Sequence, residues 1–454
     1  MTPLRVAVVG GGLAGITAAL DCADAGADVT LYEARPRLGG ATFSFRRNGY
    51  WLDNGQHVAL RCCTAYRGLL AKLGTDAHLE LQPRLRVPVL DAGGSSATFA
   101  RTALPAPLHL AGALLRYRHI PVRDRLAAVR AVAALRSLDL SDPRLDELAF
   151  GQWLRSHGQS RQAIDRLWDL IALPTLNLHA EDASLGLAAF VFRTGLIDES
   201  DACDLAVPTV PLSRLHGDAA ARALRSRGVS VKLRAKVERV RPAGDLFELE
   251  LREGSVDADA VISAVPHHAA PALLPDGVVP ADTAERLGTS PIVNVHLHYD
   301  RRVLHEPVVA AVSSPVQWIF DRTSSSGVED GQLLSISLSA AHDELQHPQA
   351  RLVETCAGAL ALMLPRARHA KLIRGMVTRE PTATFRAAPG TARLRPPART
   401  PVPGLALAGA WTGTGWPATM EGAVRSGSAA AAAVLSDAPR RRARPGGART
   451  ELAA

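Results

Sequence analysis

Three glycines near the start of the chain have the spacing of a phosphate-binding turn. Gly10, Gly12 and Gly15 form G-x-G-x-x-G directly after the apolar run Leu4–Val9. The first glycine permits a tight turn, the second lets backbone N–H groups approach a pyrophosphate, and the third lets the next helix pack closely on the strand. Glu33 stands eighteen residues after Gly15, where a carboxylate accepts hydrogen bonds from a ribose diol. The chemistry indicated is dinucleotide binding.

A second glycine pair favours FAD over NAD as the dinucleotide. Gly39 and Gly40 follow Glu33 by six and seven residues, and Arg37 lies close to them. This addition is typical of FAD proteins of the glutathione-reductase type, because it brings more flexible backbone near the phosphates. An NAD domain usually continues with alternating strands and helices, whereas this chain continues with GYWLDNGQHV.

The C-terminal part of the chain returns to a glycine-rich loop and a helix. Leu405–Ala408 is an apolar strand, Gly409–Trp416 is a loop, and Pro417 suits the first position of a helix. The positive end of that helix would face the N1–C2=O edge of a flavin, which gains negative charge on reduction. We therefore expect the two ends of the chain to hold opposite ends of one FAD.

The elements that must position these residues follow from the apolar pattern. A helix over Leu13–Ala25, ended by Gly26, and a strand over Val29–Glu33 complete the first unit. Residues 228–265 read as a β-meander and a return to the nucleotide sheet. The expected fold is α/β, a discontinuous FAD-binding Rossmann-like domain of the glutathione-reductase type with an α+β substrate domain. The expected division is FAD-binding residues 1–84, 206–267 and 375–437, substrate-binding residues 85–205 and 268–374, and a disordered basic tail 438–454.

The length and composition of the chain are sufficient for a large buried interior. The chain has 454 residues, 47% of them apolar, and five cysteines with no C-x-x-C pair, which favours reduced thiols and a cytoplasmic protein. The net charge of +8 is concentrated partly in the tail, which favours a solvated appendage over contact with acidic lipid headgroups or nucleic acid. The run at residues 102–115 is too short and too proline-broken to span a bilayer, so any membrane contact is peripheral. His267-His268 and His296-x-His298 lack a third ligand at recognisable spacing, so no metal is expected.

Seven further segments, together with these glycines, resemble the FAD-dependent amine oxidase and desaturase superfamily. Within it the chain is similar to the squalene-associated FAD-dependent desaturases, the hydroxysqualene dehydroxylases of hopanoid and squalene biosynthesis. The segments are LDNGQH, PTLNLHAEDAS, PLSRL, PIVNVHLHYDRRV, VQWIFDR, ATFRAAPGTARLRPPART and TGWPATMEGAVRSG. Three positions depart from the pattern: Ala41 stands where arginine is common, and Ala410 and Gly413 replace acids of the C-terminal loop.

The resemblance implies a reaction and a set of site residues. Reduced flavin would deliver hydride to an allylic carbon of hydroxysqualene while water leaves, in a dry apolar tunnel. The catalytic candidates are His57 and Asp53 as proton donors, although Asp53 and Gln56 could instead only fix their loop. Glu421 would position its helix or bind a flavin hydroxyl, and Trp411 would flank the flavin or only pack. The candidate cofactor-binding residues are Gly10, Gly12, Gly15, Glu33, Arg37, Gly39, Gly40, Gln56, Val237, Gly409, Trp411, Thr419, Met420 and Glu421.

Two other functions remain open from the sequence. A carotenoid desaturase or an amine oxidase would move hydride toward the flavin; an amine oxidase often keeps a lysine near the flavin, and this chain has only four lysines. A non-catalytic prenyl-lipid-binding protein on the same fold is the third interpretation, kept open by the missing acids at Ala410 and Gly413. In every case the expected partner is a hydrophobic small molecule, with no nucleic acid; the sequence is also compatible with a homodimer.

Overall fold

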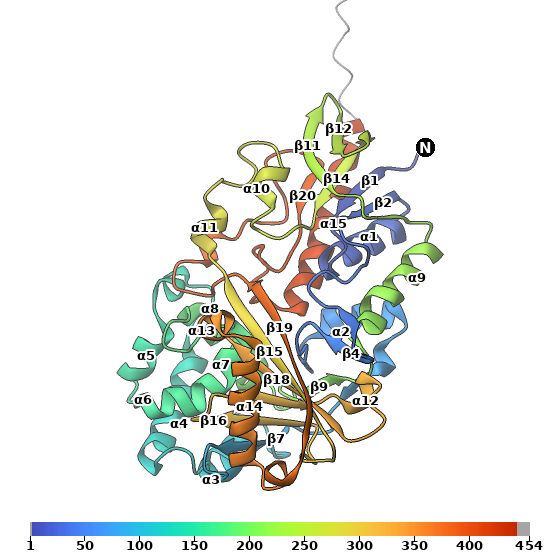
Figure 1. Ribbon diagram of the computed structural model, residues 1–454. Helices are drawn as coiled ribbons and strands as arrows, with labels where there is room; N and C mark the ends of the chain where they lie inside the picture. Colours follow the sequence, from blue (N-terminus) through green and yellow to red (C-terminus); the bar gives the residue numbers. More distant parts are fainter. Residues whose placement is uncertain (1, 443–454) are drawn as a thin grey trace, which may run out of the picture.

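The nucleotide sheet is assembled from strands that lie far apart in the chain. The computed structural model describes residues 2–442, with side chains to residue 437. Five parallel strands form a sheet in the order β10-β2-β1-β14-β20. Their bounds are β1 Arg5–Val9, β2 Asp28–Glu33, β10 Ser230–Leu233, β14 Ala260–Ser263 and β20 Leu405–Leu407. In Figure 1 the red C-terminal strand and helix accordingly lie beside the blue N-terminal unit. The predicted fold class is confirmed.

Two helices from opposite ends of the chain pack directly on each other against this sheet. α1 spans Leu13–Asp24 and α15 spans Met420–Arg442. A Cβ added at Gly427 of α15 would lie 2.3 Å from the carbonyl oxygen of Ala14 in α1. Only glycine permits this approach, so the small residues of the C-terminal segment do bring the two ends of the chain together.

The C-terminal helix begins and ends differently from the expectation. It starts at Met420 rather than Pro417, because Thr419 acts as its N-cap: the Thr419 hydroxyl accepts a hydrogen bond from the N–H of Gly422 at 3.2 Å. It also continues through residues 438–442, the first part of the predicted disordered tail. Asp437 anchors this end, since its carboxylate pairs with Arg399 and accepts the Gly404 N–H. The remaining predicted tail lies outside the described residues.

The expected β-meander is present. It consists of β11 Val237–Ala243, β12 Leu246–Leu251 and β13 Gly254–Ala258, and it joins β10 to β14 of the nucleotide sheet. α9 (Asp218–Ser226) precedes β10, so the middle of the chain re-enters the nucleotide sheet through a helix and returns through the meander.

A second, seven-stranded sheet forms the centre of the other half of the molecule. Its order is β19-β15-β18-β17-β16-β7-β8. The bounds are β7 Arg86–Asp91, β8 Ser96–Ala100, β15 Ser290–Tyr299, β16 Val308–Val312, β17 Trp318–Asp321, β18 Gln332–Ser339 and β19 Leu372–Thr384. The domain division stays a prediction, but a boundary at residue 375 would fall inside β19, which pairs with β15 from residue 372 to residue 384. We place that boundary after Thr384.

The strand β15 has two different faces. Val293, Val295 and Leu297 pack with α14 (Gln349–Met363) in one apolar cluster. The alternate residues, among them Asn294 and His296, point to the opposite face. The sheet therefore presents a polar surface on the side away from α14.

Helices cover the remaining surface of this half. They are α3 Ala111–Arg116, α4 Val122–Ser137, α5 Phe150–Ser156, α6 Arg161–Ala163, α7 Asp169–Leu176 and α8 Leu185–Phe192, with π-helical turns η4 at Ile164–Trp168 and η5 at Arg193–Ile197. The short connecting elements are β3 Ser44–Arg47, β4 Tyr50–Asp53, β5 Ala59–Leu60, β6 Leu79–Leu81, β9 Leu205–Pro208, α2 Thr64–Leu73, α10 Ala270–Leu273, α11 Thr283–Leu287, α12 Thr323–Ser326 and α13 His342–Gln346. Among the described residues, no helix combines the length and apolar character needed to cross a bilayer.

Candidate active site

The two glycine segments of the N-terminal unit meet face to face. The N–H of Gly39 donates to the carbonyl of Gly11 at 2.8 Å. A Cβ added at Gly40 would lie 2.7 Å from the Cα of Gly12. The pair forms a bare backbone surface at the start of α1, where helix N–H groups are free to bind phosphate. This surface is called the glycine cradle below and comprises Gly10–Gly12, Gly39 and Gly40.

Gly10 and Gly15 shape the turn that carries this cradle. Gly10 has φ +112°, a backbone conformation that side chains disfavour. A Cβ at Gly15 would lie 1.8 Å from the carbonyl oxygen of Gly10, so the helix could not pack on the strand with any larger residue. The predicted roles of Gly10 and Gly15 match the backbone geometry, and the phosphate contact at Gly12 stays a prediction.

Glu33 is held in place by backbone donors. Its Oε2 accepts the N–H of Gly11 at 2.6 Å and its Oε1 accepts the N–H of Arg35 at 2.7 Å. A carboxylate has about four lone-pair positions, so two remain for the hydroxyls of a ribose. Val237 lies nearby along the chain, because Ala235 donates its N–H to the Glu33 carbonyl at 3.0 Å.

Arg37 closes the side of the cradle. Its guanidinium carbon lies 3.3 Å from the centre of the Phe43 ring, and Nη1 donates to the carbonyl of Gly40 at 3.1 Å. Burial lowers the pKa of Arg37, without removing its charge at neutral pH. The cation is thus fixed next to the glycine pair, as expected for a phosphate-binding surface.

The C-terminal loop folds back on itself around Trp411. Gly409 has φ +135°, and a Cβ there would lie 2.7 Å from the indole ring of Trp411. The indole Nε1 donates to the carbonyl of Val265, just after β14, at 3.0 Å. Trp411 is buried and packs the loop onto the nucleotide sheet, which is the packing alternative considered from the sequence.

The start of α15 offers free backbone donors. The Thr419 hydroxyl accepts the N–H of Gly422. The N–H groups of Met420 and Glu421 have no acceptor among the described residues. The side chain of Glu421 does not point to such a ligand: its carboxylate accepts the N–H groups of Ala65 at 3.1 Å and Tyr66 at 2.7 Å. Its Oε1 also accepts a hydrogen bond from Nε of Arg425 in its own helix at 2.7 Å, so Glu421 caps α2 and fixes the start of α15; a bond to a cofactor hydroxyl stays a prediction.

Arg395 is a site residue that the sequence analysis missed. Its side chain is buried, and its guanidinium donates to four carbonyl groups of the C-terminal loop, those of Ala410, Trp411, Thr412 and Trp416. Burial lowers its pKa to about 10, partly opposed by Asp146. The cation therefore stays charged at neutral pH and binds the loop at the position where the two family acids are missing.

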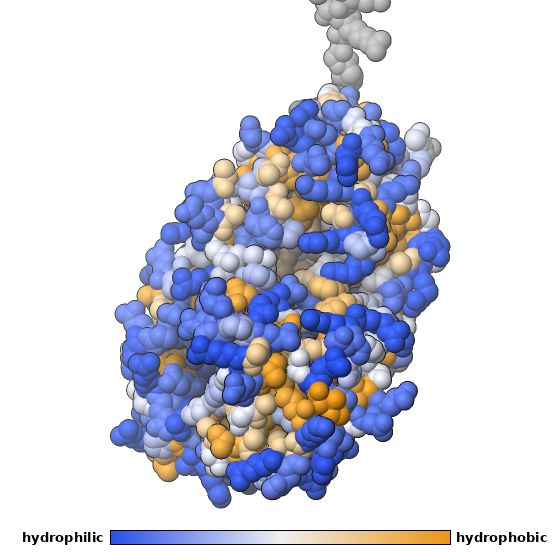
Figure 2. Space-filling model, viewed as in Figure 1, coloured by the Kyte–Doolittle hydropathy of each residue, from blue (hydrophilic) through white to orange (hydrophobic). Residues whose placement is uncertain are grey.

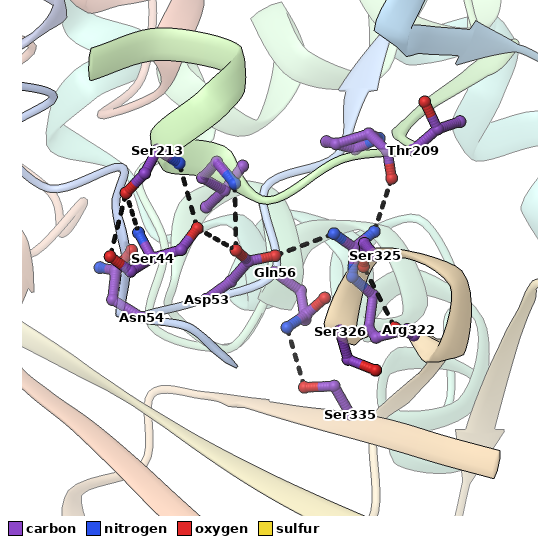
Figure 3. A network of polar contacts seen from close by, with 12 residues as sticks. Ser44, Asp53, Asn54, Gln56, Thr209, Ser213, Arg322, Ser325, Ser326 and Ser335 are labelled. Carbon is purple, nitrogen blue, oxygen red and sulfur yellow. Dashed lines mark hydrogen bonds and ion pairs between the residues drawn. The ribbon is translucent and has the colours of Figure 1, made fainter. Parts of the chain in front are cut away.

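Asp53 joins three segments through a buried ion pair (Figure 3). Its Oδ2 lies 2.9 Å from Nη2 of Arg322, and its Oδ1 accepts the hydroxyl of Ser44 at 2.6 Å and the N–H of Leu212 at 3.1 Å. Arg322 also donates to the carbonyl of Pro208 at 2.6 Å. With all these bonds made within the protein, Asp53 fixes its loop, which favours the structural interpretation over a role as acid.

Gln56 connects this loop to the polar face of the seven-stranded sheet. Its Nε2 donates to the hydroxyl of Ser335 at 2.8 Å (Figure 3). That hydroxyl lies 3.1 Å from Nδ1 of His296. His296 is 1% exposed, and its Nε2 has no partner among the described residues. A buried, unpartnered ring nitrogen is costly, so this position is suited to a polar group of a ligand.

His57 is neutral at physiological pH. Burial lowers its pKa to about 4; the negative charge of Asp53 opposes this shift, and the positive charge of Arg322 adds to it. The imidazolium expected of a proton-donating histidine is therefore not the resting form. A neutral imidazole can still donate a hydrogen bond to a developing negative charge, and this is the role the environment allows.

Three histidines with lowered pKa values, the buried His216 and His296 and the half-buried His57, should make the stability of the folded protein depend on pH. Burial lowers the pKa of His57 and His296 to about 4 and that of His216 to about 3. Since an unfolded histidine titrates near 6.5, the unfolded chain binds protons that the folded protein rejects. We expect the free energy of unfolding to fall as the pH decreases from about 6.5 to about 4. Urea unfolding at pH 7.5, 6 and 5 tests this, and His216→Gln should flatten the dependence; identical slopes for both proteins would contradict it.

An apolar pocket lies in the helical part of the other half. It has a volume of about 430 Å³ and is lined by side chains of α3, α4, α7, α8 and the two π-helical turns. Arg136 is its one charged lining residue among those described. Phe192 of α8 lines the pocket, while Phe190 of the same helix contacts Trp416 of the C-terminal loop, ring centres 5.1 Å apart. α8 therefore connects the pocket wall to that loop.

Comparisons with known proteins agree with this arrangement. The model of the family described as flavin containing amine oxidoreductase matches residues 13–435. The chain is 29% identical to a hydroxysqualene dehydroxylase of Sinorhizobium fredii over 96% of this chain and 99% of the relative. It is 24% identical to a 15-cis-phytoene desaturase of Solanum lycopersicum over 96% of this chain and 78% of that protein. A solved putrescine oxidase variant shares the fold, with a TM-score of 0.70, 22% identity, and coverage of 96% of this chain and 100% of that one.

The family match begins directly after Gly12 and spans nearly all of the described chain, including Gly39, Gly40 and α15 as far as residue 435. FAD is the cofactor of this enzyme, as the cradle and the family both indicate. The chain is an FAD-dependent oxidoreductase that belongs to the flavin-containing amine oxidoreductase family.

Proposed function

We propose that this protein reductively dehydroxylates hydroxysqualene to squalene. The observation that carries the proposal is the apolar pocket. One of its walls is α8, and α8 also contacts the C-terminal loop, because Phe190 packs against Trp416. A long polyprene needs such a dry, apolar site, whereas a cationic amine needs a carboxylate partner, and the one charged residue of the described lining is the cation Arg136. The hydroxysqualene dehydroxylases among the relatives, 27% to 29% identical over nearly the whole chain, support the same substrate.

FAD would be held at both ends. The glycine cradle and Arg37 suit the pyrophosphate, Glu33 suits the ribose, and the free N–H groups of Met420 and Glu421 suit a flavin carbonyl edge. When bound and reduced, FAD supplies the hydride for this reaction. Overall the allylic C–O bond would break, a C–H bond would form from the hydride, and the hydroxide would leave as water; the hydride and the proton together equal the two hydrogens that fully reduced FAD gives up on oxidation.

The chain's own residues would assist the departing hydroxyl and exclude water. Neutral His57 and the unpartnered Nε2 of His296 are the groups suited to hydrogen-bond the substrate oxygen. Asp53 and Arg322 hold the loop that carries His57, and Gln56 holds it against Ser335. The apolar pocket would protect a cation-like allylic state from bulk water.

Anaerobic single-turnover measurement tests the reaction. Photoreduced holoprotein mixed with hydroxysqualene should reoxidise its flavin and release squalene in a one-to-one ratio. Phytoene, offered to the oxidised protein, tests the desaturase alternative that the tomato relative supports. Flavin reduction by phytoene, with no reoxidation by hydroxysqualene, would overturn the proposed direction of hydride flow.

His57→Ala is expected to lower the rate of dehydroxylation by about 10² to 10⁴, the usual contribution of a positioned proton-transfer or hydrogen-bonding group. Flavin absorbance should be unchanged, because the cradle and the C-terminal loop remain. Stopped-flow reoxidation measures the step, and His57→Gln, which keeps a hydrogen-bond donor, should recover part of the rate. Full activity in the alanine variant would remove His57 from the mechanism.

A further inference from the structure

Exposed apolar side chains concentrate on one short stretch of the surface. Six large apolar residues between residues 104 and 129 are 51% to 62% exposed: Leu104, Leu108, Leu115, Val122, Leu126 and Val129. The other large apolar residues exposed among the described ones are spread singly over the rest of the chain. A concentration of this kind marks a surface that contacts a partner, a membrane or a ligand when the protein functions.

The helix α4 explains how this surface is built. Its buried side is made of small residues, including Ala127, Ala128 and Ala131. Val122, Leu126 and Val129 recur at intervals of four and three residues, so they lie along one stripe on the opposite, exposed side. The helix is thus apolar on both sides, although only one side packs against the protein.

The same stretch is strongly basic. Residues 102–138 contain six arginines and a single acid. That acid, Asp124, is 3% exposed, accepts the hydroxyl of Ser160 at 2.7 Å and lies 3.9 Å from Nε of Arg123, so it offsets at most one of the six positive charges. The exposed cations are Arg116, Arg118, Arg123, Arg130 and Arg136. Exposed apolar groups among cations match an anionic lipid surface, where cations meet headgroups and apolar side chains enter the acyl boundary.

The apolar pocket opens at this surface. Leu108 and Val129 are both exposed members of the patch and lining residues of the pocket. The inner wall is formed by Trp168 and Phe192, and α8 continues from there to the C-terminal loop. α3 and α4 lie at the end of the molecule remote from the nucleotide sheet (Figure 1). In the same view, Figure 2 shows apolar patches (orange) among the hydrophilic residues (blue) of this lower half, the largest of them to the right of α3 and α4.

We propose that the surface formed by residues 104–136, named here the α3–α4 surface, docks on an anionic lipid bilayer. The docked surface places the pocket mouth in the acyl region, so that a polyprene enters from the membrane without crossing water. The identity of that polyprene rests on the proposed function, whereas docking itself does not.

Vesicle co-flotation of the holoprotein tests docking. The protein should float with vesicles of phosphatidylglycerol and phosphatidylethanolamine and only weakly with pure phosphatidylcholine. The variant Leu115→Ser/Val122→Ser/Leu126→Ser, whose three positions do not line the pocket, should reduce binding at least tenfold, and Arg118→Ala/Arg123→Ala/Arg130→Ala should remove the preference for anionic lipid. Leu362→Ser, at a side chain 58% exposed on α14, is the matched control and should bind as the unmodified protein does.

Activity in two media separates docking from the proposed reaction. The serine variant should turn over hydroxysqualene in detergent at the normal rate but lose at least tenfold from vesicles. Binding of the unmodified protein to neither vesicle, or undiminished binding by the serine variant, would overturn docking. Loss of a dimer in the serine variant without any vesicle binding would assign the α3–α4 surface to a second copy of the chain instead. Vesicle binding without turnover in either medium would leave docking standing and reject the reaction.

Discussion

Gly12→Val is expected to abolish FAD binding while the protein stays folded. A Cβ at Gly12 would lie 3.7 Å from the Cα of Gly40, an ordinary contact, so the backbone tolerates the first added atom. The two further methyl groups of valine would occupy the cradle itself, where the pyrophosphate must approach bare backbone. Because the pyrophosphate cannot overlap the methyl groups of valine, it could not reach the backbone N–H groups of the cradle. The variant should therefore lose nearly all of its affinity for FAD.

Flavin content and stability together measure this effect. The purified variant should be colourless and should not take up added FAD, while its far-ultraviolet circular dichroism matches that of the unmodified apoprotein. Gly358→Val on α14 is a suitable control, since nothing lies within 4 Å of a Cβ at that position. Gly15→Val should by contrast impair folding, because its Cβ would lie 1.8 Å from a backbone oxygen. A yellow Gly12→Val protein with ordinary FAD affinity would contradict the assignment of the cradle.

Arg395→Met should weaken FAD binding by at least tenfold and lower the free energy of unfolding by about 2–4 kcal/mol. Its guanidinium donates hydrogen bonds to four carbonyl groups of the C-terminal loop. A hydrogen bond to a charged group contributes about 1.5–3 kcal/mol, and such contributions do not add up fully within one cluster. Without Arg395, no single side chain would donate hydrogen bonds to the carbonyl groups of the loop between Gly409 and Trp416. The N–H groups at the start of α15 would then no longer be held in position for the flavin.

Equilibrium FAD titration and urea unfolding of the holoprotein measure the two effects of Arg395→Met. Arg395→Lys should recover little, because an ammonium cannot present the planar fork that reaches several carbonyls. Arg393→Met is the control, since the Arg393 side chain is 70% exposed. Its ion pair with the exposed carboxylate of Glu147, at 3.7 Å, should contribute little to stability. Equal FAD affinity in the Arg395 and Arg393 variants would show that the loop does not depend on the buried cation.

Local spacing was enough to predict the nucleotide unit. The roles of Gly10, Gly12 and Gly15 depend on backbone geometry within one turn, which residue type and interval determine directly. The apolar strand at Leu405 and the small residues around Gly427 likewise predicted that the C-terminal segment joins the N-terminal sheet. Both expectations agree with the strand order and with the contact between α15 and α1.

Side-chain roles that depend on distant segments could not be predicted in the same way. Glu421 caps α2, more than three hundred residues earlier in the chain, so nothing in its own helix indicates this partner. Arg395 lies in a proline-rich segment and acts only because the loop after β20 folds over it. His57 was considered an acid from the ordinary pKa of histidine, whereas burial changes that pKa. The start of α15 was misplaced because proline also occurs just before an N-cap.

The central claim is that the glycine cradle and the start of α15 hold opposite ends of one FAD molecule. A crystal structure of the FAD-bound protein tests it most directly. The account predicts the ribose hydroxyls on the carboxylate of Glu33, the pyrophosphate between Gly12 and Gly40, and the flavin carbonyl edge on the N–H groups of Met420 and Glu421. An FAD bound with its ring away from α15, or a ring site filled by protein side chains, would contradict it.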